Sequence, residues 1–479
     1  MTERKPDIAV ITVSPDRRYL RTIWLLLSVI GWVGSGLAQH YDNPVTKALA
    51  GANSAVTRGF LCVGQNPANL GMSTPYRTYF QAFGINYYIT NNFYSLETGR
   101  HFGRDLTADD GALQAEFLRK LPTDGWRFNN GFNSALPFVN FSLGNKALTT
   151  NLIYTNDLYL SRPVLDVVFG GVEKGQLYQL DMRWDAMTAI EYAYSMAIPY
   201  ENIAVGLSLK YLQGLGYYGL DPRYNTGQIV VDTARFLLCG DGEYYFRESY
   251  AGRGYGADIG IAVEDVYGWN MGISLLNIGE SVKWNSETMI SKVLKDLALR
   301  LMGQQLRSGL IKTSDIKLDF KGEDFRYRFT IDSLNAEKLF RGDSTFQALL
   351  QSNKRITRDS TVFRVPLPLV LKIGLARHIQ PNLLMALDFT ASFSDRFGYT
   401  RSWRSAVGFE YTPLPRTPLR VGLAVGGLSG WEFDIGSGLA WGPLHVDWAF
   451  GFHRGVWAHT AQGVNFSLGA YLTGKGKVQ

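Results

Sequence analysis

Apolar residues alternate with small or polar residues along most of the chain, and the alternation is clearest between Leu367 and Phe393. Side chains on a β-strand switch faces at every residue, so this period gives each strand one apolar face. In this stretch Leu369, Leu371, Ile373 and Leu375 share one face, and Val370, Lys372, Gly374 and Ala376 share the other. Segments of about ten residues with this period are typical of transmembrane β-strands.

Turn signals divide the pattern into fourteen strands, an even number. We expect them near residues 76–90, 137–145, 148–160, 176–198, 202–216, 253–265, 269–284, 366–378, 382–395, 402–412, 418–427, 431–441, 444–453 and 462–472. If the first strand runs outward, every link on the inner side is short, and the long connections 91–136, 161–175, 217–252 and 285–365 all fall on the outer side. This sorting is typical of outer-membrane barrels. A strand pair within 226–247 is expected to extend the fifth and sixth strands outward.

The main alternative is a soluble β-sandwich or propeller. The polar faces of such folds meet water and carry many charged residues and threonines. Here the second face is rich in Gly, Ala and Ser, which suits a crowded interior, and the chain holds 51 Gly and 13% aromatic residues. The sequence therefore predicts an all-β fold, a transmembrane antiparallel β-barrel. Trp269, Trp284, Trp431, Trp441 and Trp448 are expected near the membrane interfaces.

The N-terminus has the features of an export signal. Arg17, Arg18 and Arg21 precede the apolar run Thr22 to Val33, and the small-residue sequence "GSGLAQ" follows. The apolar run is shorter than the roughly 20 residues of a spanning helix. We expect residues 1–38 to be a signal peptide, cleaved after Ala38, and the mature protein to reside in the bacterial outer membrane, in contact with its lipid.

Charge and motifs indicate little chemistry. The net charge is +6, but Lys and Arg are scattered, so no nucleic-acid partner is expected. Asp181, Arg183 and Asp185 should share the inner face of the fourth strand as a ladder of charges in the lumen. Cys62 and Cys239 lie far apart, and their pairing stays open. His453 and His459 flank the last outer loop, and we expect no metal there. Without a recognisable catalytic motif, neither an enzyme nor a cofactor is predicted.

Three stretches of the outer loops have helical spacing. In Ser291 to Leu306, Leu294, Leu297 and Leu301 lie on one apolar stripe. Short helices are also expected in Asn335 to Gln351 and in Leu113 to Leu121. Such helices would either cover the mouth of the barrel to bury their own stripes or bind an apolar ligand or a protein partner there.

Three motifs resemble one family. The segment Ala48 to Met72, with "QNPANL" at its centre, resembles the N-terminal hatch of FadL-like outer-membrane proteins. Gly254 to Trp284, which contains "NIG", and Val365 to Ile379, which contains "LKIGLA", resemble a hairpin and a strand of the same group. This group includes fatty-acid transporters, aromatic-hydrocarbon channels and the secretion component PorV, and the motifs come nearest to a branch known as a domain of unknown function. The resemblance implies a barrel of about 14 strands over residues 76–475, with residues 39–75 as a plug and 285–365 as a long, partly helical outer loop.

Two functions follow as hypotheses. A hydrophobic small molecule would be caught by Leu294, Leu297 and Leu301 and would pass when a plug centred on Asn66, Pro67 and Ala68 shifts. Alternatively, the chain is a PorV-like interaction protein whose outer loops hold a secreted or surface protein. A purely structural barrel is a third possibility.

Overall fold

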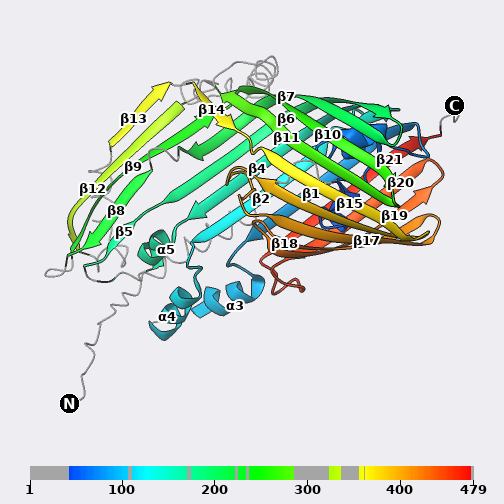
Figure 1. Ribbon diagram of the computed structural model, residues 1–479. Helices are drawn as coiled ribbons and strands as arrows, with labels where there is room; N and C mark the ends of the chain where they lie inside the picture. The colour runs from blue at the N-terminus through cyan, green and yellow to red at the C-terminus, as the bar shows by residue number, and fades with distance from the viewer. Residues whose placement is uncertain are drawn as a thin grey trace, which may run out of the picture.

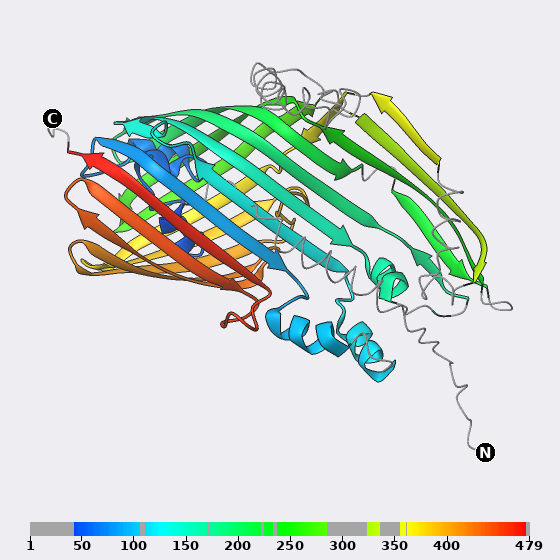
Figure 2. The ribbon, with the colours of Figure 1, turned by 180° about the vertical axis from the view of Figure 1, so that it is seen from behind.

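The computed structural model describes residues 43–475 except 106–110, 170–172, 174, 222–224, 233–236, 285–322, 336–354 and 361. Most of these residues belong to one antiparallel sheet that closes on itself (Figures 1 and 2). Its fourteen wall strands are β1 (Thr78–Asn91), β2 (Trp126–Ala135), β4 (Lys146–Leu160), β6 (Met182–Tyr200), β7 (Ile203–Leu220), β10 (Gly252–Val266), β11 (Trp269–Trp284), β15 (Val370–Gln380), β16 (Leu383–Ser392), β17 (Arg404–Leu414), β18 (Thr417–Gly426), β19 (Gly430–Trp441), β20 (Leu444–His453) and β21 (Gly463–Gly474).

The seam between the first and last strands closes the barrel. β1 pairs with β21 from Thr78 opposite Gly474 to Thr90 opposite Gly463. The predicted strand count is therefore confirmed. All the expected short links join strands at the end of the barrel that carries the C-terminus, which we call the short-turn end. The opposite end, which we call the long-loop end, carries the long connections. Among the described residues, no helix is long and apolar enough to span a membrane.

The second wall strand differs from the prediction of 137–145. It consists of β2 (Trp126–Ala135), an interruption at 136–140, and the short β3 (Phe141–Leu143). β2 pairs with the C-terminal part of β1, from Gly84 to Asn91. β3 pairs with the N-terminal part of β1, from Thr78 to Phe80. The sequence of β2, "WRFNNGFNSA", hardly alternates, because it carries buried asparagines on both of its faces, at Asn129, Asn130 and Asn133. Period-two reasoning therefore overlooked it.

A sheet extension continues beyond the barrel at the long-loop end (Figure 1). It contains β5 (Leu177–Gln179), β8 (Thr226–Val231), β9 (Leu237–Ser249), β12 (Glu323–Asn335) and β13 (Arg355–Ser360), paired in the order β5–β8–β9–β12–β13. β8 and β9 confirm the strand pair expected within 226–247. β12 and β13 show that part of the loop 285–365 is sheet, in stretches for which no helix was expected. β14 (Phe363–Pro366) joins the wall beside β11. The helix predicted at 291–306 and most of the one at 335–351 lie outside the described residues.

Three helices stand beside the long-loop end: α3 (Leu96–Asp105), α4 (Gly111–Lys120) and α5 (Arg162–Phe169). α4 confirms the helix expected at Leu113 to Leu121. An aromatic cluster that includes Phe102, Phe117 and Phe169 fixes these helices to one another and to Trp126 at the start of β2. This small core holds the helices at the barrel's rim.

The two faces of the wall differ as the pattern predicts. On β7, Val205 and Leu209 are more than half exposed outward, whereas Ala204, Ser208 and Lys210 are buried inward. Most wall strands likewise expose large apolar side chains, which would be a strongly unfavourable surface in water. Trp441 is 75% exposed on this surface. Trp284 is an exception to the expected placement, because it is fully buried against Tyr217 and Phe363.

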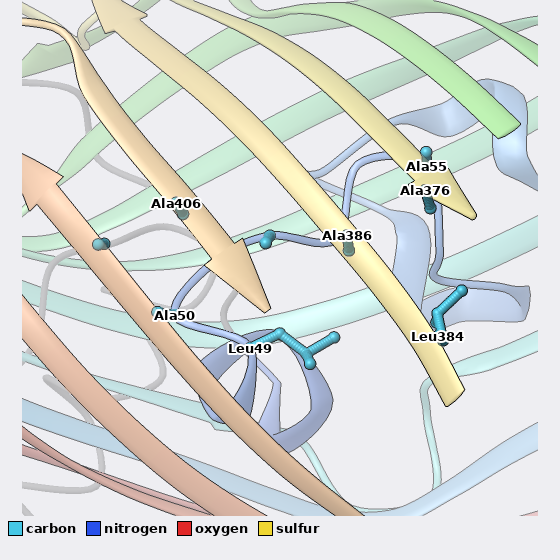
Figure 3. Packing of buried hydrophobic residues seen from close by; sticks show 9 residues of the cluster. Leu49, Ala50, Ala55, Ala376, Leu384, Ala386 and Ala406 are labelled. Atoms are coloured by element: carbon cyan, nitrogen blue, oxygen red, sulfur yellow. The ribbon is translucent and has the colours of Figure 1, made fainter. Parts of the chain in front are cut away.

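Residues 43–75, which we call the inner segment, lie inside the barrel near the short-turn end (Figure 2). The segment contains α2 (Pro44–Ala48) and the 3-10 helices η1 (Gly59–Cys62) and η2 (Pro67–Gly71). Leu49 and Ala50 pack against inward alanines of β15, β16 and β17, namely Ala376, Ala386 and Ala406 (Figure 3). Small wall residues therefore make the space that the inner segment fills.

Candidate functional site

The motif Asn66-Pro67-Ala68 begins η2 and is buried against the wall. The Asn66 side chain caps η2 by accepting from the backbone N–H of Ala68 at 3.1 Å, and its Nδ2 donates to the carbonyl of Ile261 in β10 at 3.0 Å. Pro67 at the first position of the helix needs no donor there. The motif thus starts the short helix and also fixes that helix to the wall.

Two glycines of the wall make this contact possible. A Cβ at Gly206 in β7 would overlap the backbone nitrogen of Ala68, and a Cβ at Gly260 in β10 would overlap Oδ1 of Asn66. Backbone atoms cannot relieve such an overlap by a side-chain rotation, so any larger residue at Gly206 would displace η2. The close approach explains the glycine that ends the "GADIG" sequence of β10, Gly260.

Polar contacts fasten the rest of the inner segment to the wall. The hydroxyl and backbone N–H of Ser54 donate to the carboxylate of Asp388 in β16. Lys372 of β15 donates to Oε1 of Gln65, and the Ser274 hydroxyl of β11 donates to the Gln65 carbonyl at 2.6 Å. The alternating pattern predicts that these wall residues face inward, and the inner segment supplies their hydrogen-bond partners.

A buried charge cluster joins β6 and β7 to the hairpin of β10 and β11. Lys210 Nζ lies 2.8 Å from Asp258 Oδ1, 3.5 Å from Glu280 Oε2 and 4.0 Å from Glu191 Oε2, and all four side chains are fully buried. Asn277, in a left-handed conformation with φ 62°, accepts from Lys210 Nζ at 2.9 Å and donates to the Pro368 carbonyl at 2.8 Å. The cluster therefore fixes the bulge at "NIG", where β11 changes its partner from β15 to β14.

A second polar network surrounds Glu432 in β19. Arg404 Nη2 lies 2.8 Å from its Oε2, Lys47 Nζ of α2 lies 3.9 Å from its Oε1, and His453 Nδ1 lies 3.9 Å from its Oε2. Asn465 Nδ2 donates to the carboxylates of both Glu432 and Asp434. His453 was expected beside a solvated loop, but it ends β20 and is 2% exposed. His459 lies in the following loop.

The predicted ladder of Asp181, Arg183 and Asp185 is arranged differently. Asp185 is buried in β6 and pairs with Arg396 of the 393–403 loop, and it accepts from the Tyr217 hydroxyl at 2.7 Å. Arg183 donates to the carbonyl of Asp395 at 3.3 Å and lies over the Tyr159 ring. Asp181 precedes β6 and is exposed. The loop between β16 and β17 supplies the counter-charge, which the strand pattern alone did not indicate.

The two cysteines are unpaired with each other. Cys62 is buried in η1, and Cys239 is half-buried in β9 of the extension. Burial raises the pKa of the Cys62 thiol to about 12. In the part of the chain that the structure describes, no group of three or more His, Cys, Asp and Glu side chains is arranged to hold a metal ion. Leu294, Leu297 and Leu301, predicted to contact a ligand, lie outside the described residues.

Behind the interruption between β2 and β3 lies a small polar cavity of about 40 Å³. Asn140 bridges the interruption: its Nδ2 donates to Gln81 of β1 at 2.8 Å and to Asn151 of β4 at 3.1 Å. On the outer side, Phe138 has φ 62° and is 67% exposed. The inner segment closes the cavity from within through Asn43, Phe60 and Leu61, among others. Side-chain amides thus supplement the backbone hydrogen bonds that remain here, from Gln81 N–H to the Asn140 carbonyl at 2.9 Å and from Leu136 N–H to the Thr150 carbonyl at 3.0 Å.

Comparisons with known proteins give structural neighbours only. No protein-family model matches the chain, and no curated protein matches its sequence. The toluene transporter TbuX of Ralstonia pickettii aligns with 12% identity over 90% of this chain and 98% of its own, with a TM-score of 0.48. A FadL homologue of Pseudomonas aeruginosa aligns with 11% identity over 91% of this chain and 99% of its own, with a TM-score of 0.45. The monoaromatic hydrocarbon channel CymD aligns with 11% identity over 92% and 100%, with a TM-score of 0.46.

What the described residues define by themselves is the class of protein: a closed antiparallel β-barrel with an apolar outer face and a polar interior that contains its own N-terminal segment.

Proposed function

We propose that this chain is an outer-membrane barrel that passes a hydrophobic small molecule between the outside and the membrane or periplasm. The exposed apolar residues of the wall support residence in a bilayer, because hydrocarbon is the solvent that favours them. Since the sheet closes at β1 and β21, the wall leaves no strand edge unpaired around the seam.

The observation that carries transport is the interruption between β2 and β3. Here the regular ladder is reduced to single backbone hydrogen bonds and is supplemented by the side chain of Asn140, and a cavity meets the wall from inside. At about 40 Å³ the cavity is far smaller than pockets for small organic ligands, which are typically ~300–1,000 Å³. Passage therefore requires the inner segment to move away from this part of the wall.

Cysteine tethering tests this requirement. In a chain carrying Cys62→Ala and Cys239→Ala, Ser54→Cys with Asp388→Cys would join the inner segment to β16, because these side chains are hydrogen-bonded. Uptake of radiolabelled toluene or dodecane by expressing cells should fall when the bond forms and return on reduction. A control tether, Thr226→Cys with Glu243→Cys, joins paired residues of β8 and β9 and should not change uptake. Uptake that is unaffected by the first tether would reject transport through movement of the inner segment.

The sheet extension favours one second candidate, a PorV-like protein that holds a secreted or surface partner. β12 and β13 carry the sheet well beyond the barrel end (Figure 1). Crosslinking through residues 285–365, followed by purification, distinguishes the two functions. A stoichiometric protein partner together with absent uptake would support the second.

A further inference from the structure

A second cavity opens at the long-loop end of the barrel, above the inner segment. It has a volume of about 40 Å³, and its lining combines Lys47 of the inner segment with β1, β2, β16, β17, β20 and the loops that follow β16 and β18. It is separate from the cavity behind the wall interruption, because no residue lines both.

The lining carries positive charge and many hydroxyl groups but no carboxylate. Lys47, Arg404 and His453 line it, and hydroxyl groups come from Tyr88, Thr90, Thr390, Ser392, Tyr399, Thr400, Ser402 and Ser429. Leu428 is the one large aliphatic residue in the lining, and no Asp or Glu belongs to it. Hydroxyl, ammonium and guanidinium groups all donate hydrogen bonds. Such a surface suits a group that is rich in acceptors.

Lys47 and Arg404, the two cations of the lining, are held by one carboxylate. Glu432, which does not line the cavity, contacts Lys47, Arg404 and His453. Asp434 lies next in the network and bonds Asn465 at 2.8 Å. Lys47 Nζ also lies 5.6 Å from the centre of the Tyr88 ring. These contacts fix the cations in place before any ligand arrives, which lowers the entropic cost of binding one.

A polar atom of one lining residue, Oγ1 of Thr90, has no hydrogen-bond partner among the described residues, and Thr90 is 2% exposed. A buried polar atom without a partner costs free energy. Because Thr90 lines the cavity, an acceptor atom of an occupant would supply this partner.

We propose that this cavity binds an oxyanion of the phosphate class, either a free phosphate or sulfate or the ester head of a larger molecule. A tetrahedral oxyanion offers more acceptor oxygens than a carboxylate and is the charge that Arg and Lys bind best together. The cavity's size suits such a group and excludes a bulky apolar body. The site is independent of the proposed transport, so a chain that passes no apolar probe can still bind the anion.

Binding is tested on the purified full chain in a non-ionic detergent. Line broadening of the phosphorus NMR signal measures the affinity for inorganic phosphate and, separately, for butyl phosphate. We expect saturable binding of at least one probe and competition by sulfate. Equal affinities would identify a free anion as the source, and tighter butyl phosphate binding would identify an ester.

Substitutions locate the site. Thr90→Val, nearly the same size as Thr, and Lys47→Met should each weaken binding about tenfold or more, because each removes a donor to a charged group. The control Lys120→Met removes an exposed lysine of α4 outside the cavity and should leave the affinity unchanged. Lys47→Met also removes a partner of Glu432, so Thr90→Val decides the result if the former does not fold. Absent saturable binding of both probes, or equal weakening by Lys120→Met, would overturn the proposal.

Discussion

Arg58 of the inner segment and Glu264 of β10 form an ion pair in which Nη2 lies 2.9 Å from Oε1. The other carboxylate oxygen, Oε2, accepts from the backbone N–H of Ser73 at 3.0 Å. One side chain therefore fastens two points of the inner segment, 15 residues apart, at the short-turn end of the barrel. Residues between these points carry η1 and η2, so the pair controls how freely both can leave the wall.

Glu264→Gln should loosen this end of the inner segment. Hydrogen bonds to charged groups contribute about 1.5–3 kcal/mol, and these are partly exposed, so we expect the free energy of local opening to fall by about 1–2 kcal/mol. Hydrogen exchange of residues 56–75, followed by mass spectrometry, measures this. The matched change Glu116→Gln breaks an exposed pair with Lys120 on α4 and should not alter exchange there. Unchanged exchange in Glu264→Gln would contradict the fastening role.

Gly206→Val should expel η2 from its place against β7. The added side chain would collide with the backbone of Ala68, and a rigid β-branched residue has few alternative rotamers. Gly216→Val on the same strand is the control, because a Cβ there meets nothing within 4 Å. Limited proteolysis of the folded barrel should cut the inner segment in the first variant only. Equal protection of both variants would contradict the packing described for η2.

Thiol labelling should distinguish the two cysteines. Cys62 is fully buried, and burial raises the pKa of its thiol to about 12, so almost no reactive thiolate exists at pH 8. Cys239 is half-buried and should react with maleimide in the folded protein. Intact mass spectrometry should therefore find one adduct in the folded state and two after denaturation. Rapid labelling of Cys62 in the folded state would mean that η1 is not held inside.

Lys210→Met should destabilise the barrel strongly. Removing one partner of a buried ion pair typically costs about 3–5 kcal/mol, and here three carboxylates would lose their common cation. The control Lys146→Met changes an exposed lysine at a turn and should have little effect. Denaturant titration in detergent, followed by gel mobility of the unheated sample, compares the two. If both variants unfold at the same denaturant concentration, the cluster has no stabilising role.

Deleting Ser291 to Leu306, or replacing Leu294, Leu297 and Leu301 together by Asn, tests the expected role of the outer loop. If this stripe captures the ligand, uptake of apolar probes should be lost while the folded barrel remains. Gel mobility of unheated samples confirms folding, and cell uptake measures function. Unchanged uptake of every apolar probe would remove this loop from the transport hypothesis.

Periodicity predicted the wall strands well because each face of a typical wall strand has uniform surroundings. The outer face is apolar and exposed, and the inner face is buried. On β15, Val370, Lys372, Gly374 and Ala376 are all buried inward, as their alternation with Leu371 and Ile373 indicates. The pattern failed where both faces are polar or buried, as in β2. It also could not locate the partners of inward charges. Arg396 and Arg404 border loops, and their carboxylates lie on strands distant in sequence, so only the folded chain brings them together.

The inner segment illustrates the same limit. The motif Asn66-Pro67-Ala68 was recognisable, but the glycines that receive it, Gly206 and Gly260, resemble ordinary strand glycines in the sequence. The cavity above Lys47 was not anticipated at all, because its lining comes from many separate elements, each contributing only a few residues. No local spacing of residues in the sequence indicates such a site.

In a membrane barrel, the outward side chains of the wall must contact lipid. Nitroxide labels placed singly at residues 204, 205, 207, 208 and 209 of β7, in protein reconstituted into liposomes, test this most directly. Labels at 205, 207 and 209 should collide with oxygen dissolved in the bilayer, and labels at 204 and 208 should be shielded from it, because these positions alternate between exposed and buried. Equal oxygen accessibility at all five positions, or outward labels that collide instead with a water-soluble nickel reagent, would contradict a membrane barrel.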